Sequence, residues 1–245
     1  MSPKLFEIMN LKKSYQGREV LKIDYLAFEE GRIYGIMGPS GAGKTTLLRL
    51  LNLLEEPTEG QIFFLGEDTA VNGTRRLALQ RQMTMVFQKT VLFNTSVFEN
   101  VAFGLKARRL NPAVVKERVF SALKDVGLKD LAQHCALSLS GGEAERLALA
   151  RAMVLKPRVL LLDEPTANLD PANVATIENL VRTMHERDGT TIILVSHNLF
   201  QAERLADEVI FLYNGRVVEK GPTERVFHAP EDDRTRAFIE GRMVY

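Results

Sequence analysis

A glycine-rich loop between an apolar run and a strong helix former constrains this chain most. The loop reads GPSGAGKTTLLRLL from Gly38 and directly follows the apolar run IYGIM at 33–37. Gly38, Gly43, Lys44 and Thr45 match the pattern G-x-x-x-x-G-K-[ST]. In that pattern backbone N–H groups surround phosphate oxygens, the lysine reaches the β and γ phosphates, and the hydroxyl binds Mg²⁺. The loop predicts a strand, a phosphate-binding turn and a helix, with a nucleotide as ligand.

Three further strand-like runs end in polar groups that suit the same chemistry. Asp163 and Glu164 follow VLLL at 159–162, Gln88 follows MTMVF, and His197 follows TIILVS. In open α/β sheets, ligands gather at the carboxyl ends of the strands. We expect Asp163 to bind Mg²⁺ and Glu164 to orient and polarise the attacking water. A lone glutamine or histidine is usually structural, but four strands that end in phosphate-site chemistry favour a functional role for both.

The remaining pattern predicts a mainly parallel α/β core. VLLL at 159–162 and TIILV at 191–195 are continuous apolar runs, which is typical of parallel strands with helices on both faces. The segment 170–189 between them predicts a helix, with Pro171 near its start and Gly189 just past its end.

The segments before this core predict strands first and helices later. Residues 4–37 are expected to form short strands with turns at Gln16-Gly17 and Glu30-Gly31, and QIFFL at 61–65 to form another. Apolar residues near helical spacing predict helices between about 98 and 135. We therefore expect one domain over 1–245, with a β-rich N-terminal part and a helical insertion at about 90–155.

Bulk properties exclude several other classes. The net charge of +1, from 32 Lys and Arg against 31 Asp and Glu, gives no basic field for nucleic acid. Cys135 is the only cysteine, so no disulfide can form within the chain, a reducing compartment is expected, and the thiol is predicted to be a buried small hydrophobe. No signal-peptide pattern and no run of roughly 18 apolar residues is present. These features predict a cytoplasmic protein that reaches a membrane only through a partner.

Taken together, these residues resemble the ATP-binding cassette family from about residue 5 to 230. Six motifs occur in the family's order: GPSGAGKT at 38–45 (Walker A), Gln88 (Q-loop), LSGGE at 139–143 (signature), LLLDEP from 160 (Walker B), ANLD at 167–170 (D-loop) and His197 (switch histidine). Tyr15 stands where the family stacks an aromatic ring on adenine. The signature departs mildly, because Glu143, Ala144 and Glu145 stand where many members carry glutamines.

The resemblance implies a P-loop NTPase cassette with a mainly parallel core sheet, an N-terminal antiparallel β subdomain and an inserted helical subdomain. It also implies ATP and Mg²⁺ as ligands, and it assigns the residues by role. The catalytic residues would be Glu164, His197, Gln88 and Lys44. Mg²⁺ would be held by Thr45, Gln88 and Asp163. The nucleotide would contact Tyr15, Gly38, Pro39, Ser40, Gly41, Ala42, Gly43, Lys44, Thr45, Thr46, Ser140, Gly141, Gly142 and Glu143.

The signature segment allows two interpretations. Ser140 and Glu143 fit a capping box, in which each side chain satisfies a backbone N–H group at a helix start. Gly141 and Gly142 leave the same helix start bare, which favours an anion. The family resemblance implies that this segment closes the ATP site of a second copy in a head-to-tail dimer.

The family resemblance also implies what the ATPase drives. We expect transport through a permease that docks on the helical insertion, since no sustained heptads separate Gln88 from Ser140 as in DNA-repair members, and translation-type members usually carry two cassettes. The run VLFNTSVFENVAFGL after Gln88 is expected to give about half of its apolar residues to the docking surface. Import of a small oxyanion such as tungstate or phosphate, delivered by a solute-binding protein, is favoured. A polar amino acid importer and an exporter or lipoprotein-release ATPase remain alternatives.

Overall fold

The computed structural model describes residues 4–167 and 169–243, and its core is a six-stranded sheet in the order β10-β9-β3-β8-β7-β6. Strands β3 (Ile33–Met37), β6 (Met83–Val86), β7 (Val159–Asp163), β8 (Thr191–Val195) and β9 (Glu208–Tyr213) run parallel to their neighbours. Only β10 (Arg216–Pro222), at the edge, pairs antiparallel with β9. The expected parallel core is confirmed.

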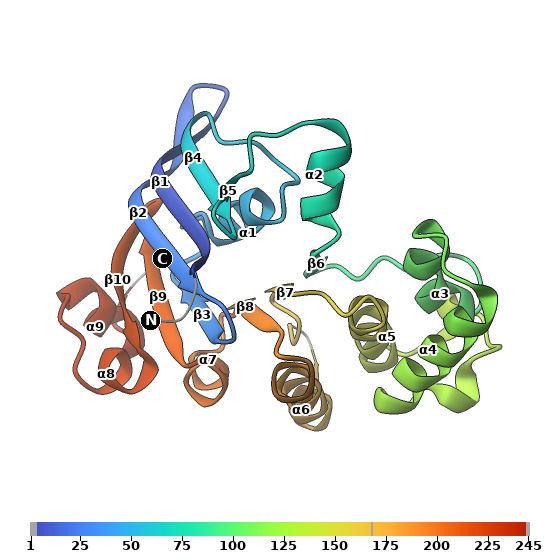
Figure 1. The fold of residues 1–245 in the computed structure, drawn as a ribbon. Coiled ribbons are helices and arrows are strands. Elements are labelled where there is room, and N and C mark those ends of the chain that lie inside the picture. The colour runs from blue at the N-terminus through green and yellow to red at the C-terminus, as the bar shows by residue number, and fades with distance from the viewer. Residues whose placement is uncertain (1–3, 168, 244–245) are drawn as a thin grey trace.

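A second, antiparallel sheet is formed by the N-terminal part, in the order β2-β1-β4-β5 (Figure 1). Its strands are β1 (Lys4–Tyr15), β2 (Arg18–Glu29), β4 (Glu59–Phe64) and β5 (Glu67–Asp68). The expectation of short strands is wrong for β1 and β2, which have 12 residues each. They form one long hairpin that tolerates bulges near both of its ends, and both turn residues, Gln16 and Gly17, have positive φ as a tight hairpin turn requires.

Helix α1 (Lys44–Leu51) lies between the two sheets. Leu47, Leu48, Leu50 and Leu51 are buried in a cluster with side chains of both sheets, among them Ile36, Leu161 and Ile193. The alternate side chains of the core strands, such as Leu160, Leu162 and Leu194, enter a second cluster with the helices on the opposite face. Both faces of the core sheet are therefore covered, which explains the continuous apolar runs.

The segment between β6 and β7 carries three helices, which extend to one side of the molecule (Figure 1). These are α3 (Val97–Ala107), α4 (Pro112–Asp125) and α5 (Gly141–Met153), and two short 3₁₀ turns at Lys129–Leu131 and Ala136–Ser138 join α4 to α5. The predicted fold class, an antiparallel β part and a helical insertion on a mainly parallel core, is confirmed. Cys135 is exposed, so the prediction of a buried thiol is wrong. It precedes the second 3₁₀ turn in extended backbone.

The remaining helices complete the fold. They are α2 (Gly73–Gln80), α6 (Pro171–Asp188), α7 (Leu199–Leu205), α8 (Thr223–His228) and α9 (Asp233–Ile239). Helix α6 begins and ends where the sequence predicts: the Asp170 side chain accepts from two N–H groups of the first turn, and Gly189 closes the helix in the left-handed conformation. Among the described residues, no helix is long and apolar enough to cross a bilayer.

Candidate functional site

The ends of four parallel strands surround one cavity of about 300 Å³. The glycine-rich loop follows β3, Gln88 follows β6, Glu164 follows β7, and His197 follows β8. These strands are neighbours in the order β3-β8-β7-β6, so residues separated by more than 150 positions meet at one edge of the sheet. The cavity is lined by Val20, Ser40, Gly41, Gly43, Lys44, Thr45, Thr46, Gln88, Glu164 and His197.

The loop before α1 holds Lys44 as its cation. The side chain is buried, and Nζ donates to the carbonyl oxygens of Gly38 at 2.7 Å and Pro39 at 2.8 Å. Burial lowers the pKa of Lys44, while Glu164 and Asp163 counteract this shift. Gly38 has φ 147°, and a Cβ there would lie 2.0 Å from the carbonyl oxygen of Leu212. This position therefore requires glycine. Gly38, Pro39 and Ala42 belong to the same loop but are not among the described residues that line the cavity.

Thr45 and Asp163 form the candidate metal site. Thr45 Oγ1 donates to Asp163 Oδ1 at 3.0 Å, which joins the first turn of α1 to the end of β7. Asp163 is buried, and burial raises the pKa of its carboxyl, with Glu164 acting in the same direction. A cation at this point would stabilise the carboxylate. A hydroxyl and a carboxylate oxygen suit Mg²⁺, which is usually bound through one or two carboxylates together with phosphates and waters.

Glu164 contacts both Gln88 and His197. Its Oε2 accepts from Gln88 Nε2 at 2.9 Å, and its Oε1 lies 2.6 Å from His197 Nε2. The backbone of Glu164 is left-handed, with φ 53°, although the residue is not a glycine. Such conformations cost free energy and concentrate at functional sites. The three side chains converge on the cavity.

Tyr15 lies at the end of β1, and its ring is 40% exposed. Its hydroxyl donates to Glu55, and the Lys13 Nζ lies 4.9 Å from the ring centre. Thr46, which lines the cavity, lies close to the hydroxyl. The ring therefore stands beside the phosphate loop with one part of its surface free. Nothing in the sequence indicates Glu55 as the residue that holds it, because the contact joins positions 40 apart.

The signature segment lies outside this cavity: within the described part of the chain, none of the lining residues comes from 139–143. The capping box is present, since Ser140 Oγ accepts from the Glu143 N–H and Glu143 Oε2 accepts from the Ser140 N–H at 2.8 Å. The Ser140 N–H and hydroxyl both donate to the Glu143 carboxylate and lower its pKa. Of the D-loop, Asn168 falls outside the described residues. The capping interpretation therefore holds in the single chain, and the segment cannot serve the chain's own cavity.

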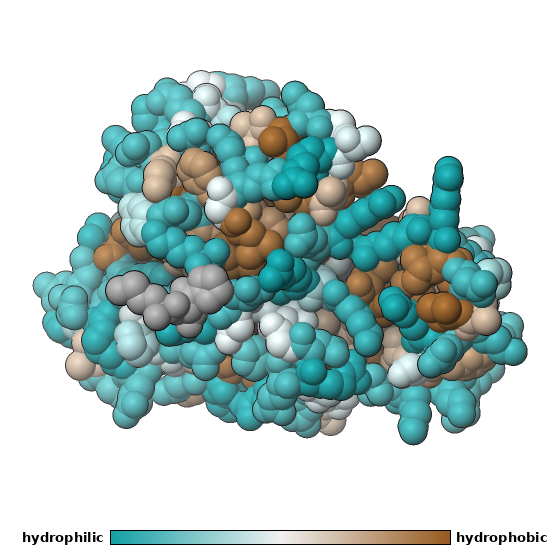
Figure 2. Space-filling view, viewed as in Figure 1, coloured by the Kyte–Doolittle hydropathy of each residue, from teal (hydrophilic) through white to brown (hydrophobic). Residues whose placement is uncertain are grey.

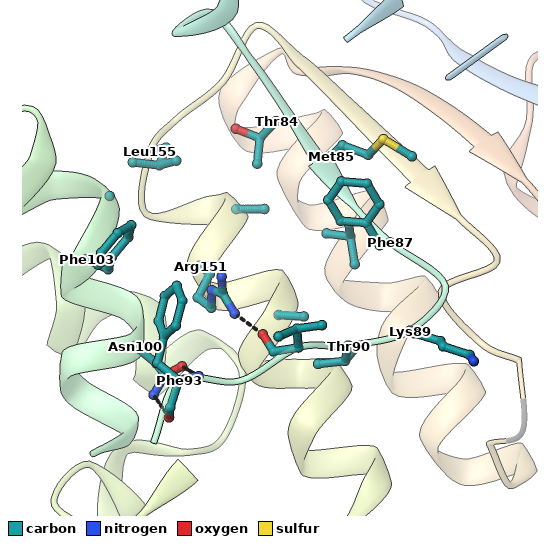
Figure 3. A pocket seen from close by; sticks show the side chains of 15 residues that line it. Thr84, Met85, Phe87, Lys89, Thr90, Phe93, Asn100, Phe103, Arg151 and Leu155 are labelled. Carbon is teal, nitrogen blue, oxygen red and sulfur yellow. Dashed lines mark hydrogen bonds between the residues drawn. The ribbon is translucent and has the colours of Figure 1, made fainter. Parts of the chain in front are cut away.

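A second cavity, of about 350 Å³, lies between β6 and the helical insertion (Figure 3). Phe87, Val91 and Phe103 line it with exposed apolar surface, and the Arg151 guanidinium packs 4.7 Å from the Phe93 ring and donates to the Val91 carbonyl. Figure 2 shows hydrophobic surface gathered where Figure 1 places α3. We call this cavity the insertion groove. Of the apolar residues in the run after Gln88, Val91, Phe93 and Phe103 line the groove, whereas Val97, Val101, Ala102 and Leu105 are buried.

Comparisons with known proteins agree with this geometry. The profile of the family described as ABC transporter matches residues 21–167. The phosphate import ATP-binding protein PstB 2 of Natronomonas pharaonis is 46% identical over 248 residues, which cover 97% of this chain and 87% of that protein. The tungstate uptake system ATP-binding protein TupC of Peptoclostridium acidaminophilum is 43% identical and covers 86% of this chain and 96% of its own length.

A solved structure gives the same fold. It is a dimeric ATP-binding cassette in a post-hydrolysis state bound to ADP and Pi, with a TM-score of 0.81 and 30% identity, covering 89% of this chain and 98% of that chain. The matched family profile spans more than half of this sequence and includes the glycine-rich loop, Gln88 and Glu164. The chain therefore belongs to the ABC transporter family, as an ATP-binding cassette.

Proposed function

We propose that this chain is the ATP-hydrolysing subunit of an importer for a small oxyanion of the tungstate or phosphate type. One observation carries the hydrolytic part of the proposal: the Glu164 carboxylate is held between the Gln88 amide and the His197 ring, beside the Lys44 loop. The relatives named for phosphate and tungstate import support the transported class.

Hydrolysis follows from the charges that converge on the cavity. Lys44 and the loop N–H groups would bind the β and γ phosphates and stabilise the charge that develops on them. Glu164 would accept a hydrogen bond from water and orient it for attack, while His197 and Gln88 fix the carboxylate. When bound, Mg²⁺ neutralises phosphate charge, and Thr45, Asp163 and Gln88 would hold it. Lys44 and Asp163 are buried, which strengthens the interactions of these two charges.

A second copy of the chain would complete each site. Because the signature segment lies outside its own cavity, Ser140, Gly141, Gly142 and Glu143 would act on the nucleotide of a partner copy. The N-terminus of α5, with its partial positive charge, suits a γ-phosphate. Hydrolysis and dimer closure would then be one event, with two ATP molecules between two head-to-tail cassettes.

The permease would dock at the insertion groove. The groove is concave and carries exposed aromatic and aliphatic side chains, which suits the apolar face of a short cytoplasmic helix. Its lining includes Phe87 and Lys89, the residues on either side of Gln88, so a docked helix would lie next to a residue of the hydrolytic site. Through this partner the chain would lie on the inner face of the cell membrane, and a solute-binding protein would act indirectly.

Substrate choice lies in the permease and the solute-binding protein, and this makes a copurification experiment the direct test. A tagged Glu164→Gln form would be pulled down from detergent-solubilised native membranes, and the copurified proteins identified by mass spectrometry. A polytopic membrane protein and a secreted solute-binding protein that binds tungstate or phosphate would support the proposal. Recovery of an amino acid-binding protein would favour a polar amino acid importer, and recovery of DNA or ribosomes would contradict transport. A permease without any solute-binding protein would favour export or lipoprotein release.

A further inference from the structure

The two signature glycines have different surroundings. Gly141 is exposed, and a Cβ added there would meet nothing within 4 Å. Gly142 is buried, and a Cβ there would lie 2.4 Å from Oδ1, 2.5 Å from Cγ and 2.7 Å from Nδ2 of Asn173. Those separations are too short for any side chain, so the amide of Asn173 occupies the space in which a residue at 142 would place its Cβ.

Asn173 cannot move away without losing two strong contacts. Its Nδ2 donates to Asp170 Oδ2 at 2.6 Å, and its Oδ1 accepts from Arg146 Nη1 at 2.7 Å. Asp170 is the N-cap of α6, and its Oδ1 also accepts from the Asn173 N–H at 3.0 Å. Arg146 belongs to α5, and its Nε donates to the Val126 carbonyl at the end of α4 at 3.1 Å. Asn173 therefore joins the start of α6 in the core to two helices of the insertion.

We propose that Asn173 is a positioning residue that fixes the signature segment relative to the start of α6, and that position 142 is a glycine because the Asn173 amide occupies the space of a Cβ there. This inference rests on the proposed head-to-tail use of the signature. In each chain, Asn173 would join the start of α6 to the surface that closes the partner's site. Asp170, at the start of α6, lies six residues after the catalytic Glu164 in the sequence.

The geometry explains why a short amide side chain suits position 173. Asn173 presents one donor to a carboxylate and one acceptor to a guanidinium, so both hydrogen bonds are charge-assisted. An aspartate would repel Asp170, and an alanine would leave Arg146 and Asp170 without their common partner. The link depends on the buried contact with Gly142 as well, since that contact holds the amide plane against α5.

A double-mutant cycle tests the proposal with Gly142→Ala, Asn173→Ala and the combined variant. Three quantities would be measured on the full chain: steady-state ATPase activity, ATP affinity of the Glu164→Gln monomer, and Tm. Asn173→Ala alone should slow turnover, because it breaks the link between α6 and α5. Gly142→Ala should slow turnover by roughly 10-fold or more, whereas adding it to Asn173→Ala should cause no further loss, because removal of the amide makes room for the new Cβ. The Tm should follow the same pattern, and ATP affinity of the monomer should not change in any variant.

Two controls make the outcomes distinct. Asn179→Ala removes an exposed amide from the same helix and should leave turnover, affinity and Tm unchanged. If Gly142→Ala is equally damaging with and without the Asn173 amide, the bare backbone itself is required and the proposal is wrong. If Ser140→Arg hydrolyses ATP normally, the proposal that the signature segment acts on the partner's nucleotide is wrong. The Tm values of the three variants then still show whether Gly142 and Asn173 are packed against each other as described.

Discussion

Removal of the Tyr15 ring should weaken ATP binding without affecting the phosphate loop. The ring stands beside Thr46, is 40% exposed, and is held in place by Glu55 and Lys13. Stacking of a base on an aromatic side chain contributes about 1–3 kcal/mol, so Tyr15→Ala should raise the Kd for ATP by roughly 5- to 150-fold. Tyr15→Phe is the matched control, because it keeps the ring and removes only the hydroxyl. We expect it to change the Kd by less than about 3-fold.

The assay is isothermal titration calorimetry with ATP and with inorganic tripolyphosphate, on the Glu164→Gln background to prevent turnover. The affinity for tripolyphosphate should be the same in all three proteins, since the loop from Gly38 to Thr45 binds phosphate without the ring. An unchanged ATP affinity in Tyr15→Ala would refute the stacking role. An equal loss for ATP and tripolyphosphate would show that Tyr15 supports the loop rather than the base.

Three further predictions concern other parts of the chain. Ser140→Arg should abolish ATPase activity, because it blocks the partner's site, while leaving nucleotide binding by the monomer nearly intact in a fluorescence titration. Asp163→Asn should raise the Tm of the nucleotide-free protein at pH 7 by about 2–4 °C in a thermal melt, because burial disfavours the carboxylate there. This gain should shrink as the pH falls towards the raised pKa of Asp163, since the wild-type carboxyl then takes up its proton, and a pH-independent gain would contradict it. Arg151→Leu should reduce recovery of the membrane partner in the copurification experiment, because the guanidinium orders the groove through Phe93 and Val91, and an unchanged yield would place the docking surface elsewhere.

Local sequence patterns predict the fold well where a residue type is typical of one structural position, such as a buried strand or a helix end. The apolar runs at 159–162 and 191–195 give the buried parallel strands, and Asp170, Pro171 and Gly189 give both ends of α6. The turn at Gln16-Gly17 is also correct. The lengths of β1 and β2 are not predictable in this way, because alternating polar residues and bulges resemble interruptions in a strand when its partners are unknown.

The sequence predicts which residues form the candidate site, but it does not predict which of them contact one another. Gln88, Glu164 and His197 follow strands that the sequence identifies, yet their meeting depends on the strand order β8-β7-β6. The roles of Glu55 and Asn173 leave no sequence signal, since each contact joins residues 27 to 40 positions apart. Cys135 shows the opposite error: a single cysteine is usually buried, but here it sits in a solvent-facing connection before a 3₁₀ turn.

We expect Glu164 to orient the attacking water in a dimer that closes on ATP. Size-exclusion chromatography with light scattering on Glu164→Gln, with and without Mg-ATP, tests it most directly, and phosphate release would be followed in the same samples. We predict a stable dimer with ATP, a monomer without it, and phosphate release slowed by about 100-fold or more. A monomer in saturating ATP would contradict the shared sites, and normal phosphate release would contradict the role of Glu164.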